Sequence, residues 1–450
     1  MKKSLLILLF TCWALFFAAF RPVMPFAAET AAFPDGTPVT GGRILMGTIG
    51  EPSNLIPYMA SDSASGEITG LLYVAPLKYD KDLNVVPWAA ASYEVLEGGR
   101  LLRFVLRDDI RWEDGVPLTA DDVEFTYKLM IDPKTPTAYS GDFLAIESFK
   151  KTGRLSFEVR YAKPFARSLM TWMGAILPKH VLEGQDIMTT PVARKPIGAG
   201  PYRLAKWDAG SMLTLTASDT YFEGRPNLDE VVYRIIPDPS TMFLELKAGK
   251  LDMMSLSPQQ YLRQTQGPQW ERDWRKYRYL SFSYTFLGFN LEHPFFKDVR
   301  VRRAISMAID RQSLIDGVLL GQGVPTVGPY KPGTWAYNDK LTPVRQDVDE
   351  ARRLLDEAGW KKNKDGLLER DGKPFLFTIL VNQGNDSRIK AAIIIQSQLK
   401  ALGITVHIRT VEWAAFIKEF VNKGHFDAII LAWTITLDPD IYDVWHSSRA

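Results

Sequence analysis

The stretch that decides the fold class lies near the end of the chain, where three apolar segments alternate with helix-forming ones. The segments read Phe375-Leu-Phe-Thr-Ile-Leu-Val381, Ile404-Thr-Val-His-Ile-Arg-Thr410 and Phe426-Asp-Ala-Ile-Ile-Leu-Ala-Trp433. β-Branched and aromatic residues dominate them, which predicts strands. Helices are expected between them, over residues 387–401 and 413–422. Strands joined in this way by helices pair in parallel beneath a helical cover, so the sequence predicts an α/β fold.

Further elements are expected before this stretch. The patterns predict a long apolar strand over residues 279–290 and an amphipathic helix over residues 298–309, whose arginines lie on a solvated face. Residues 290–450 therefore read as one α/β lobe. Nearer the N-terminus, strands are predicted over residues 42–48, 101–106, 212–216 and 231–236.

Residues 1–28 have the layout of a cleavable signal peptide. Two lysines precede an apolar run over residues 5–20, and alanines follow near residue 28. The run is shorter than the roughly 18 apolar residues that a membrane span needs. Cys12 follows Thr11, an unsuitable neighbour for lipoprotein processing, so no lipid anchor is expected. An unanchored exported protein is retained where an outer membrane prevents its loss, which points to the periplasm.

The composition limits the classes of function. The single cysteine lies in the signal segment, so the mature chain has no disulfide and must rely on a large apolar core. With 450 residues, 46% of them hydrophobic, the chain is long enough for about three domains or lobes. Its formal net charge of +2 falls close to zero once the signal segment is removed. A nearly neutral surface argues against a nucleic-acid partner.

The residue types that catalysis needs do not form a recognisable set. The five histidines never occur four residues apart with a glutamate between them, so no metal site is predicted, and no cofactor is expected. Gly198 and Gly200 are followed by Pro201, which lacks a backbone donor that a phosphate loop requires. Asp438 and Asp440 could be the carboxylate pair of a glycoside hydrolase, although paired acids in loops are more often turn residues.

Several motifs spread over the mature chain carry a family resemblance. The first is Ile110-Arg-Trp-Glu-Asp-Gly-Val-Pro-Leu-Thr119, followed by a predicted helix that Thr119 caps, with Asp122 completing a capping box. This order resembles the family 5 extracellular solute-binding proteins, the receptors that feed peptides and related solutes to ABC importers. Later matching motifs include Pro196-Ile-Gly-Ala-Gly-Pro-Tyr202, Asp219-Thr-Tyr-Phe-Glu-Gly-Arg-Pro226, Ala351-Arg-Arg-Leu-Leu-Asp-Glu-Ala-Gly-Trp360 and Gly424-His-Phe-Asp-Ala-Ile-Ile-Leu-Ala-Trp433.

The resemblance implies a type II periplasmic-binding-protein fold, with two α/β lobes around a cleft and an extra subdomain on the first lobe. By analogy, the first lobe comprises residues 33–70 and 191–280, the inserted subdomain residues 71–190, the hinge crossover residues 281–289, and the second lobe residues 290–450. The family pattern continues for several dozen residues beyond the Asp-Pro-Asp segment. The resemblance therefore implies that the return crossover into the first lobe is missing and that the sequence is truncated at its C-terminal end.

The resemblance also implies where a ligand binds. In peptide-binding members an extended ligand lies between a first-lobe loop and a second-lobe strand, and its backbone supplies most of the hydrogen bonds. Taken in the order loop, strand, crossover and subdomain, the matching residues are Ser61, Asp62, Ser63, Trp433, Thr434, Ile435, Tyr284, Phe286 and Tyr139. Trp413 is a further aromatic candidate.

One departure from the family pattern concerns the amino terminus of the ligand. Peptide-binding members place an aspartate three residues after the tryptophan to pair with the ammonium group of the ligand, and this chain has Thr436 there. Threonine carries no charge. Asp438 is the candidate substitute, although Pro439 beside it perturbs the strand.

The leading hypothesis is a monomeric, non-catalytic periplasmic receptor that captures oligopeptides or related solutes and delivers them to an ABC importer permease in the inner membrane. Because Thr436 replaces the expected acid, an oligosaccharide receptor of the same family is an alternative. A secreted glycoside hydrolase, acting through Asp438 and Asp440, is the alternative from another class. A truncated chain without function would instead show a broad, non-cooperative thermal transition.

Overall fold

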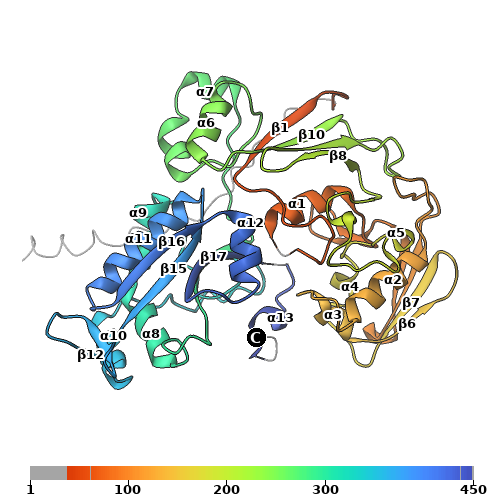
Figure 1. Ribbon diagram of the computed structural model, residues 1–450. Helices are drawn as coiled ribbons and strands as arrows, with labels where there is room; N and C mark the ends of the chain where they lie inside the picture. Colours follow the sequence, from red (N-terminus) through yellow and green to blue (C-terminus); the bar gives the residue numbers. More distant parts are fainter. Residues whose placement is uncertain (1–37, 61, 436, 448–450) are drawn as a thin grey trace, which may run out of the picture.

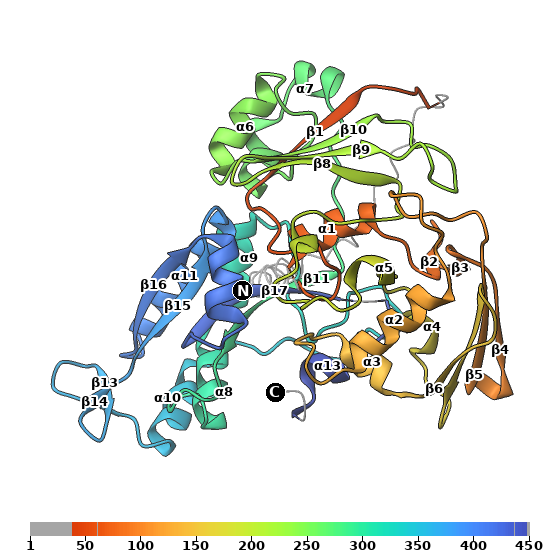
Figure 2. The same cartoon turned by 45° about the vertical axis from the view of Figure 1, so that its right-hand side comes forward.

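The computed structural model describes residues 38–60, 62–435 and 437–447. The predicted signal peptide and two predicted site residues, Ser61 and Thr436, lie outside the described residues. Figure 1 shows two bodies side by side, which we call the N-terminal body (residues 38–280) and the C-terminal body (residues 281–447). In Figure 2, turned by 45°, the short helix α13 (Tyr442–Trp445) again lies between them.

The N-terminal body contains two four-stranded sheets. In one, with the order β1-β10-β9-β8, β1 is parallel to β10 and the other pairs are antiparallel. Its strands are β1 (Arg43–Thr48), β8 (Tyr202–Asp208), β9 (Met212–Ala217) and β10 (Glu230–Ile235). The other sheet is antiparallel and has the order β4-β5-β7-β6, with strands β4 (Ala90–Leu96), β5 (Leu101–Leu106), β6 (Ile146–Lys151) and β7 (Ser156–Tyr161). A hairpin joins β2 (Leu77–Tyr79) to β3 (Val85–Pro87).

One continuous core lies beneath both sheets of the N-terminal body. Phe104 of β5 and Leu213 of β9 belong to the same cluster of buried side chains. The α-helices described in this body are α1 (Ser63–Leu72), α2 (Ala120–Ile131), α3 (Ser140–Leu144), α4 (Ser168–Thr171), α5 (Lys179–Leu182), α6 (Pro239–Lys247) and α7 (Pro268–Asp273). The capping box predicted at Thr119 and Asp122 is present at the start of α2.

The C-terminal body confirms the predicted parallel sheet. The strand order is β11-β17-β15-β16, and β15 is parallel to both β16 and β17. The strands are β11 (Ser283–Phe289), β15 (Leu376–Asn382), β16 (Thr405–Val411) and β17 (Ala428–Thr434). The sheet packs against α8 (Val299–Ala308), α9 (Arg311–Leu319), α10 (Val348–Glu357) and α11 (Asp386–Lys400), and a small sheet comprises β12 (Lys361–Lys362), β13 (Leu368–Arg370) and β14 (Lys373–Pro374).

Two predicted elements differ from the structure. The strand expected over residues 279–290 is limited to Ser283–Phe289, because Ser283 pairs with Thr434, the last residue of the partner strand β17. The helix expected over residues 413–422 consists of one α-helical turn, α12 (Trp413–Ala415), followed by the π-helical segment η4 (Phe416–Val421). The wider turn is seen in the bond from the amide of Asn422 to the carbonyl of Ile417 at 2.9 Å.

Candidate functional site

The carboxyl ends of the three parallel strands of the C-terminal body face the N-terminal body. After β15, Gly384 lies so close to the other body that a Cβ atom built on it would be 2.3 Å from the carbonyl oxygen of Pro237. After β16, the indole of Trp413 packs on Gly50, where a Cβ atom would be 2.9 Å from the ring. Ligands of open α/β sheets bind at this edge. The topology therefore places the candidate site between the two bodies.

Aromatic side chains cover one face of the paired strands β11 and β17. Tyr284 is directly opposite Trp433 in the antiparallel ladder. The ring of Phe286 stacks on Trp433 with centroids 6.2 Å apart and an interplanar angle of 14°. Trp433 stays 42% exposed, whereas burial raises the pKa of Tyr284 to about 12. Tyr284, Phe286 and Trp433 together form an apolar platform, in which the ring of Trp433 is open to a ligand.

The backbone leaves the sheet directly after this platform. Thr434 is the last residue of β17 and is exposed. The next residue, Ile435, donates its amide to the carbonyl of Phe282 at 2.7 Å. The predicted strand residues Trp433, Thr434 and Ile435 are therefore brought together with Tyr284 and Phe286.

The loop before α1 belongs to the N-terminal body and is held there by residues 137–139. The ring of Tyr139 lies edge-on to Tyr58, with centroids 6.1 Å apart, and its hydroxyl donates to the carbonyl of Ala60 at 3.5 Å. The hydroxyl of Thr137 donates to the carbonyl of Tyr58 at 2.8 Å. These contacts tie Tyr139, which is 44% exposed, to the loop that leads to Ser61 and Asp62.

Asp62 stabilises this loop and the start of α1 through hydrogen bonds. It is the N-cap of α1 and only 5% exposed. One carboxylate oxygen accepts from the amide of Ser65 at 2.9 Å, and the other accepts from the hydroxyls of Ser53 at 2.5 Å and Ser65 at 2.7 Å. Such bonds satisfy an orphan amide of the helix end. Ser63, by contrast, begins α1 with an exposed side chain.

The segment 437–440 runs from β17 to the N-terminal body. Asp438 acts as a turn residue, because its Oδ1 accepts from the amide of Asp440 at 2.9 Å. The carbonyl of Pro439 accepts from the hydroxyl of Tyr330 at 2.8 Å, and the carbonyl of Asp440 accepts from Nη1 of Arg167 at 2.9 Å. Sequence patterns indicated neither Tyr330 nor Arg167, because no motif distinguishes them from other loop residues.

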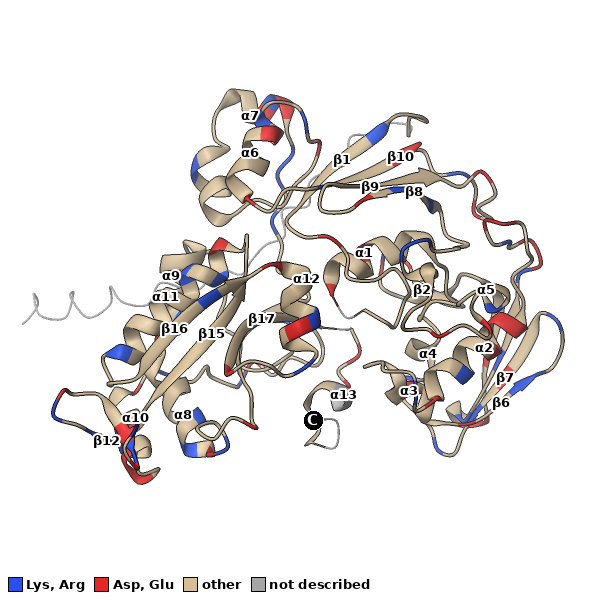
Figure 3. Ribbon diagram, viewed as in Figure 1, with Lys and Arg blue, Asp and Glu red and all other residues tan. Residues whose placement is uncertain are grey.

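Figure 3 shows basic and acidic residues interspersed on both bodies. Among the described residues, no group of three or more His, Cys, Asp and Glu could hold a metal ion. In the same part of the chain, no helix has the length and apolar character to cross a membrane.

Comparisons with known sequences give a consistent result. A family model described as bacterial extracellular solute-binding proteins, family 5, matches residues 84–449. The chain is 34% identical over 424 residues to the oligopeptide-binding protein AppA of Bacillus subtilis strain 168, which covers 92% of this chain and 77% of that protein. It is 27% identical over 377 residues to the dipeptide-binding protein of Escherichia coli strain K12, covering 78% and 68% of the two chains.

Solved structures show the same likeness in three dimensions. The Bacillus subtilis AppA structure in complex with a nonapeptide has a TM-score of 0.86 at 34% identity, covering 92% of this chain and 83% of that one. NikZ from Campylobacter jejuni in complex with Ni(L-His) has a TM-score of 0.79 at 27% identity, with coverage of 91% and 81%.

Proposed function

The chain belongs to the bacterial extracellular solute-binding proteins of family 5, and from this premise we propose that it captures oligopeptides between its two bodies and delivers them to an ABC transporter. The family consists of binding receptors, so the chain is a receptor and not an enzyme. The carboxylate pair Asp438 and Asp440 thus loses its hydrolase interpretation. These two residues have a structural role instead. The amide of Asp440 donates to the Asp438 carboxylate within a turn, and the carbonyl of Asp440 accepts from Arg167.

The observation that carries the peptide proposal is the exposed, stacked Trp433 at the carboxyl end of β17. A peptide lying along Thr434 and Ile435 would be held by backbone hydrogen bonds, as in strand addition. The apolar platform of Tyr284, Phe286 and Trp433 would then accept side chains with little selectivity. Tyr139 would close over the ligand from the N-terminal body.

Ligand binding in this proposal is coupled to a hinge motion. The hinge lies where residues 281–289 enter the sheet as β11. A ligand that touches both bodies has more contacts when they are close together, so it shifts the population toward the closed state. The closed state would be the form that the permease in the inner membrane recognises.

The division into lobes follows the family analogy. Residues 33–70 with 191–280 would be the first lobe, residues 71–190 its inserted subdomain, and residues 290–450 the second lobe. The receptor would act as a monomer in the periplasm. The remaining proposed ligand contacts are Ser61, Asp62, Ser63, Trp413, Thr436 and Asp438.

Native mass spectrometry of protein purified gently from a periplasmic extract tests the proposal. A ladder of bound peptide masses is the expected result. Bound oligosaccharide masses would overturn the peptide assignment and favour the sugar receptor that the uncharged Thr436 suggests. An empty, unfolded charge distribution would reject the receptor altogether.

A further inference from the structure

A cavity lies beyond the carboxyl ends of β15 and β16 and is lined by both bodies. Its volume is about 220 Å³. That is below the roughly 300–1,000 Å³ of clefts that hold a whole drug-sized ligand, so the cavity fits one side chain or terminal group. The lining residues are Ile49, Gly50, Glu51, Gly210, Ile235, Pro237, Gln383, Glu412 and Trp413.

Two carboxylates line this cavity, one from each body. Glu51 is oriented by the N-terminal body, because its Oε2 accepts from Nε1 of Trp207 at 3.2 Å and from the amide of Gly210 at 2.9 Å. Glu412 is oriented by the C-terminal body as the N-cap of α12, with one oxygen accepting from the amide of Ala414 and the other from that of Ala415. Neutral donors fix both carboxylates and leave their negative charges uncompensated.

The lining itself contains no cation. Within the described part of the chain, neither Glu51 nor Glu412 forms an ion pair. The guanidinium of Arg194 stacks on the ring of Trp207 at 3.8 Å, and Nη1 of Arg388 donates to the side chain of Asn382 at 2.8 Å. Neither arginine is among the lining residues. A like-charged pair that lines one cavity attracts a cation and resists the approach of the two bodies without one.

The rest of the wall suits an organic cation. The indole of Trp413 offers a ring face of the kind that binds ammonium and guanidinium groups. Gln383 adds a side-chain amide.

We propose that this cavity between the two bodies is a subsite for an alkylammonium or guanidinium group of the ligand, with Glu51 and Glu412 as the residues that select it. The inference rests on the proposed function, since it assumes a peptide in the cleft. It adds a substrate class: peptides with a basic side chain, or with a free amino terminus, at the position that reaches this cavity. Because each carboxylate belongs to a different body, the cation also favours closure.

The test is isothermal titration of the full chain with pentapeptides of alanine in which one residue at a time is lysine or its uncharged counterpart norleucine. Each peptide is used with a free and with an acetylated amino terminus, which separates the two sources of the cation. We expect one lysine position, or the free terminus, to bind roughly tenfold tighter than its uncharged match, equivalent to about 1.4 kcal/mol.

Glu51→Gln and Glu412→Gln should each bring the ratio of the two affinities close to one. Glu419→Gln is the control, because Glu419 is an exposed glutamate that pairs with Lys423. This variant should keep the wild-type ratio. Two substitutions on different bodies guard against misfolding of either one. Equal binding of the charged and uncharged peptides, or a ratio that survives both substitutions, overturns the subsite and leaves peptide capture standing. Absence of binding by every peptide overturns the proposed function itself.

Discussion

The guanidinium of Arg167 joins two parts of the chain that are far apart in sequence, because its Nη1 donates to the carbonyl oxygen of Asp440 at 2.9 Å. Arg167 comes just before α4 in the N-terminal body, and Asp440 follows β17 in the C-terminal body. The same guanidinium pairs with Asp142 at 2.9 Å, where the two side chains are 18% and 14% exposed. The ion pair with Asp142 orients the Arg167 guanidinium, and this guanidinium links the two bodies beside the candidate site.

Loss of this link should weaken ligand binding. Arg167→Ala removes a hydrogen bond from a charged donor, a contribution of roughly 1.5–3 kcal/mol, so peptide affinity should fall on the order of tenfold. Titration calorimetry gives the affinity, and small-angle X-ray scattering gives the population of closed molecules. Arg160→Ala is the matched control, since Arg160 pairs with Glu97 at an exposed position. Equal losses in the two variants would refute a special part for Arg167.

Trp433→Ala should lower affinity while leaving the fold intact. The side chain is 42% exposed, so its removal costs little packing, but the platform loses its open ring. We expect peptide affinity to fall by at least about tenfold, within the range seen for aromatic hot spots, with an unchanged circular dichroism spectrum. Trp433→Phe keeps an aromatic ring on Phe286 and should retain most of the affinity. Unchanged binding by Trp433→Ala would remove this residue from the site.

Asp62→Ala should reduce stability more than Ser63→Ala does. The substitution leaves the amide of Ser65 and the hydroxyl of Ser53 without their buried acceptor, which costs about 1–3 kcal/mol. A fall in the urea midpoint of the N-terminal body checks this. Ser63 begins the same helix with an exposed side chain, so its variant should unfold like the wild type. A stable Asp62→Ala with poor binding would contradict the stabilising role and leave ligand contact as the only role of Asp62.

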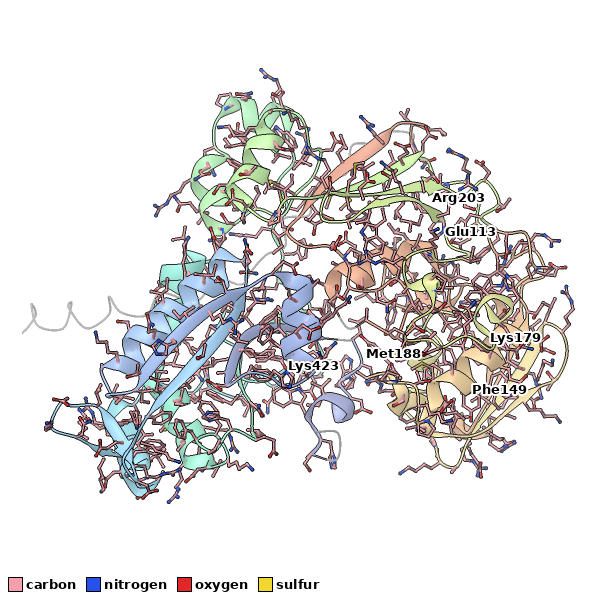
Figure 4. The ribbon with its side chains drawn as sticks, in the orientation of Figure 1. Glu113, Phe149, Lys179, Met188, Arg203 and Lys423 are labelled. Carbon is pink, nitrogen blue, oxygen red and sulfur yellow. The ribbon has the colours of Figure 1, made fainter. Side chains whose placement is uncertain are left out.

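Stability should depend on pH through Glu113, which lies beside Arg203 in Figure 4. Burial raises the pKa of Glu113 from 4.5 to about 7, with the Arg203 guanidinium opposing the shift and Asp114 adding to it. The fold therefore prefers the protonated acid. This contribution is complete below about pH 4.5 and is lost as the pH rises through about 7.

Glu113→Gln should remove the loss of stability that the wild type shows as the pH rises. At pH 8 the variant should be more stable than the wild type by on the order of 1 kcal/mol, after allowance for solvent screening of a partly exposed group, and the gain should vanish toward pH 4.5. Urea unfolding between pH 5 and 8 measures it. Glu183→Gln, at an exposed position beside Lys179, should not change the pH profile. A constant difference across this range would contradict the titration of Glu113.

Local patterns predicted the α/β elements that determine the fold. Residue patterns predicted the strands β15, β16 and β17 and the helix α11 between the first two. Thr119 and Asp122 also form the expected capping box. The likeness to solved structures confirms the type II binding-protein fold class. Strand order, however, depends on long-range pairing, and no sequence pattern placed β11 beside β17.

The candidate site was less accessible to sequence reasoning. Trp433, Tyr284 and Phe286 share one face because antiparallel pairing puts residues 284 and 433 opposite each other. The contacts of Arg167 and Tyr330 with backbone carbonyls leave no sequence pattern, since any residue can offer a carbonyl. Glu51 and Glu412 are 361 positions apart in the printed sequence, and only the tertiary fold makes them line one cavity.

The edge position of β11 also limits the order in which the parts of the chain can fold. β11 is hydrogen-bonded to β17, which is made long afterwards, so the ribosome releases a strand carrying Tyr284 and Phe286 well before its partner exists. An unpaired apolar strand in a nascent chain is prone to aggregation. The N-terminal body has its own core and can form it first, whereas β11 stays unpaired until residues 428–434 are available.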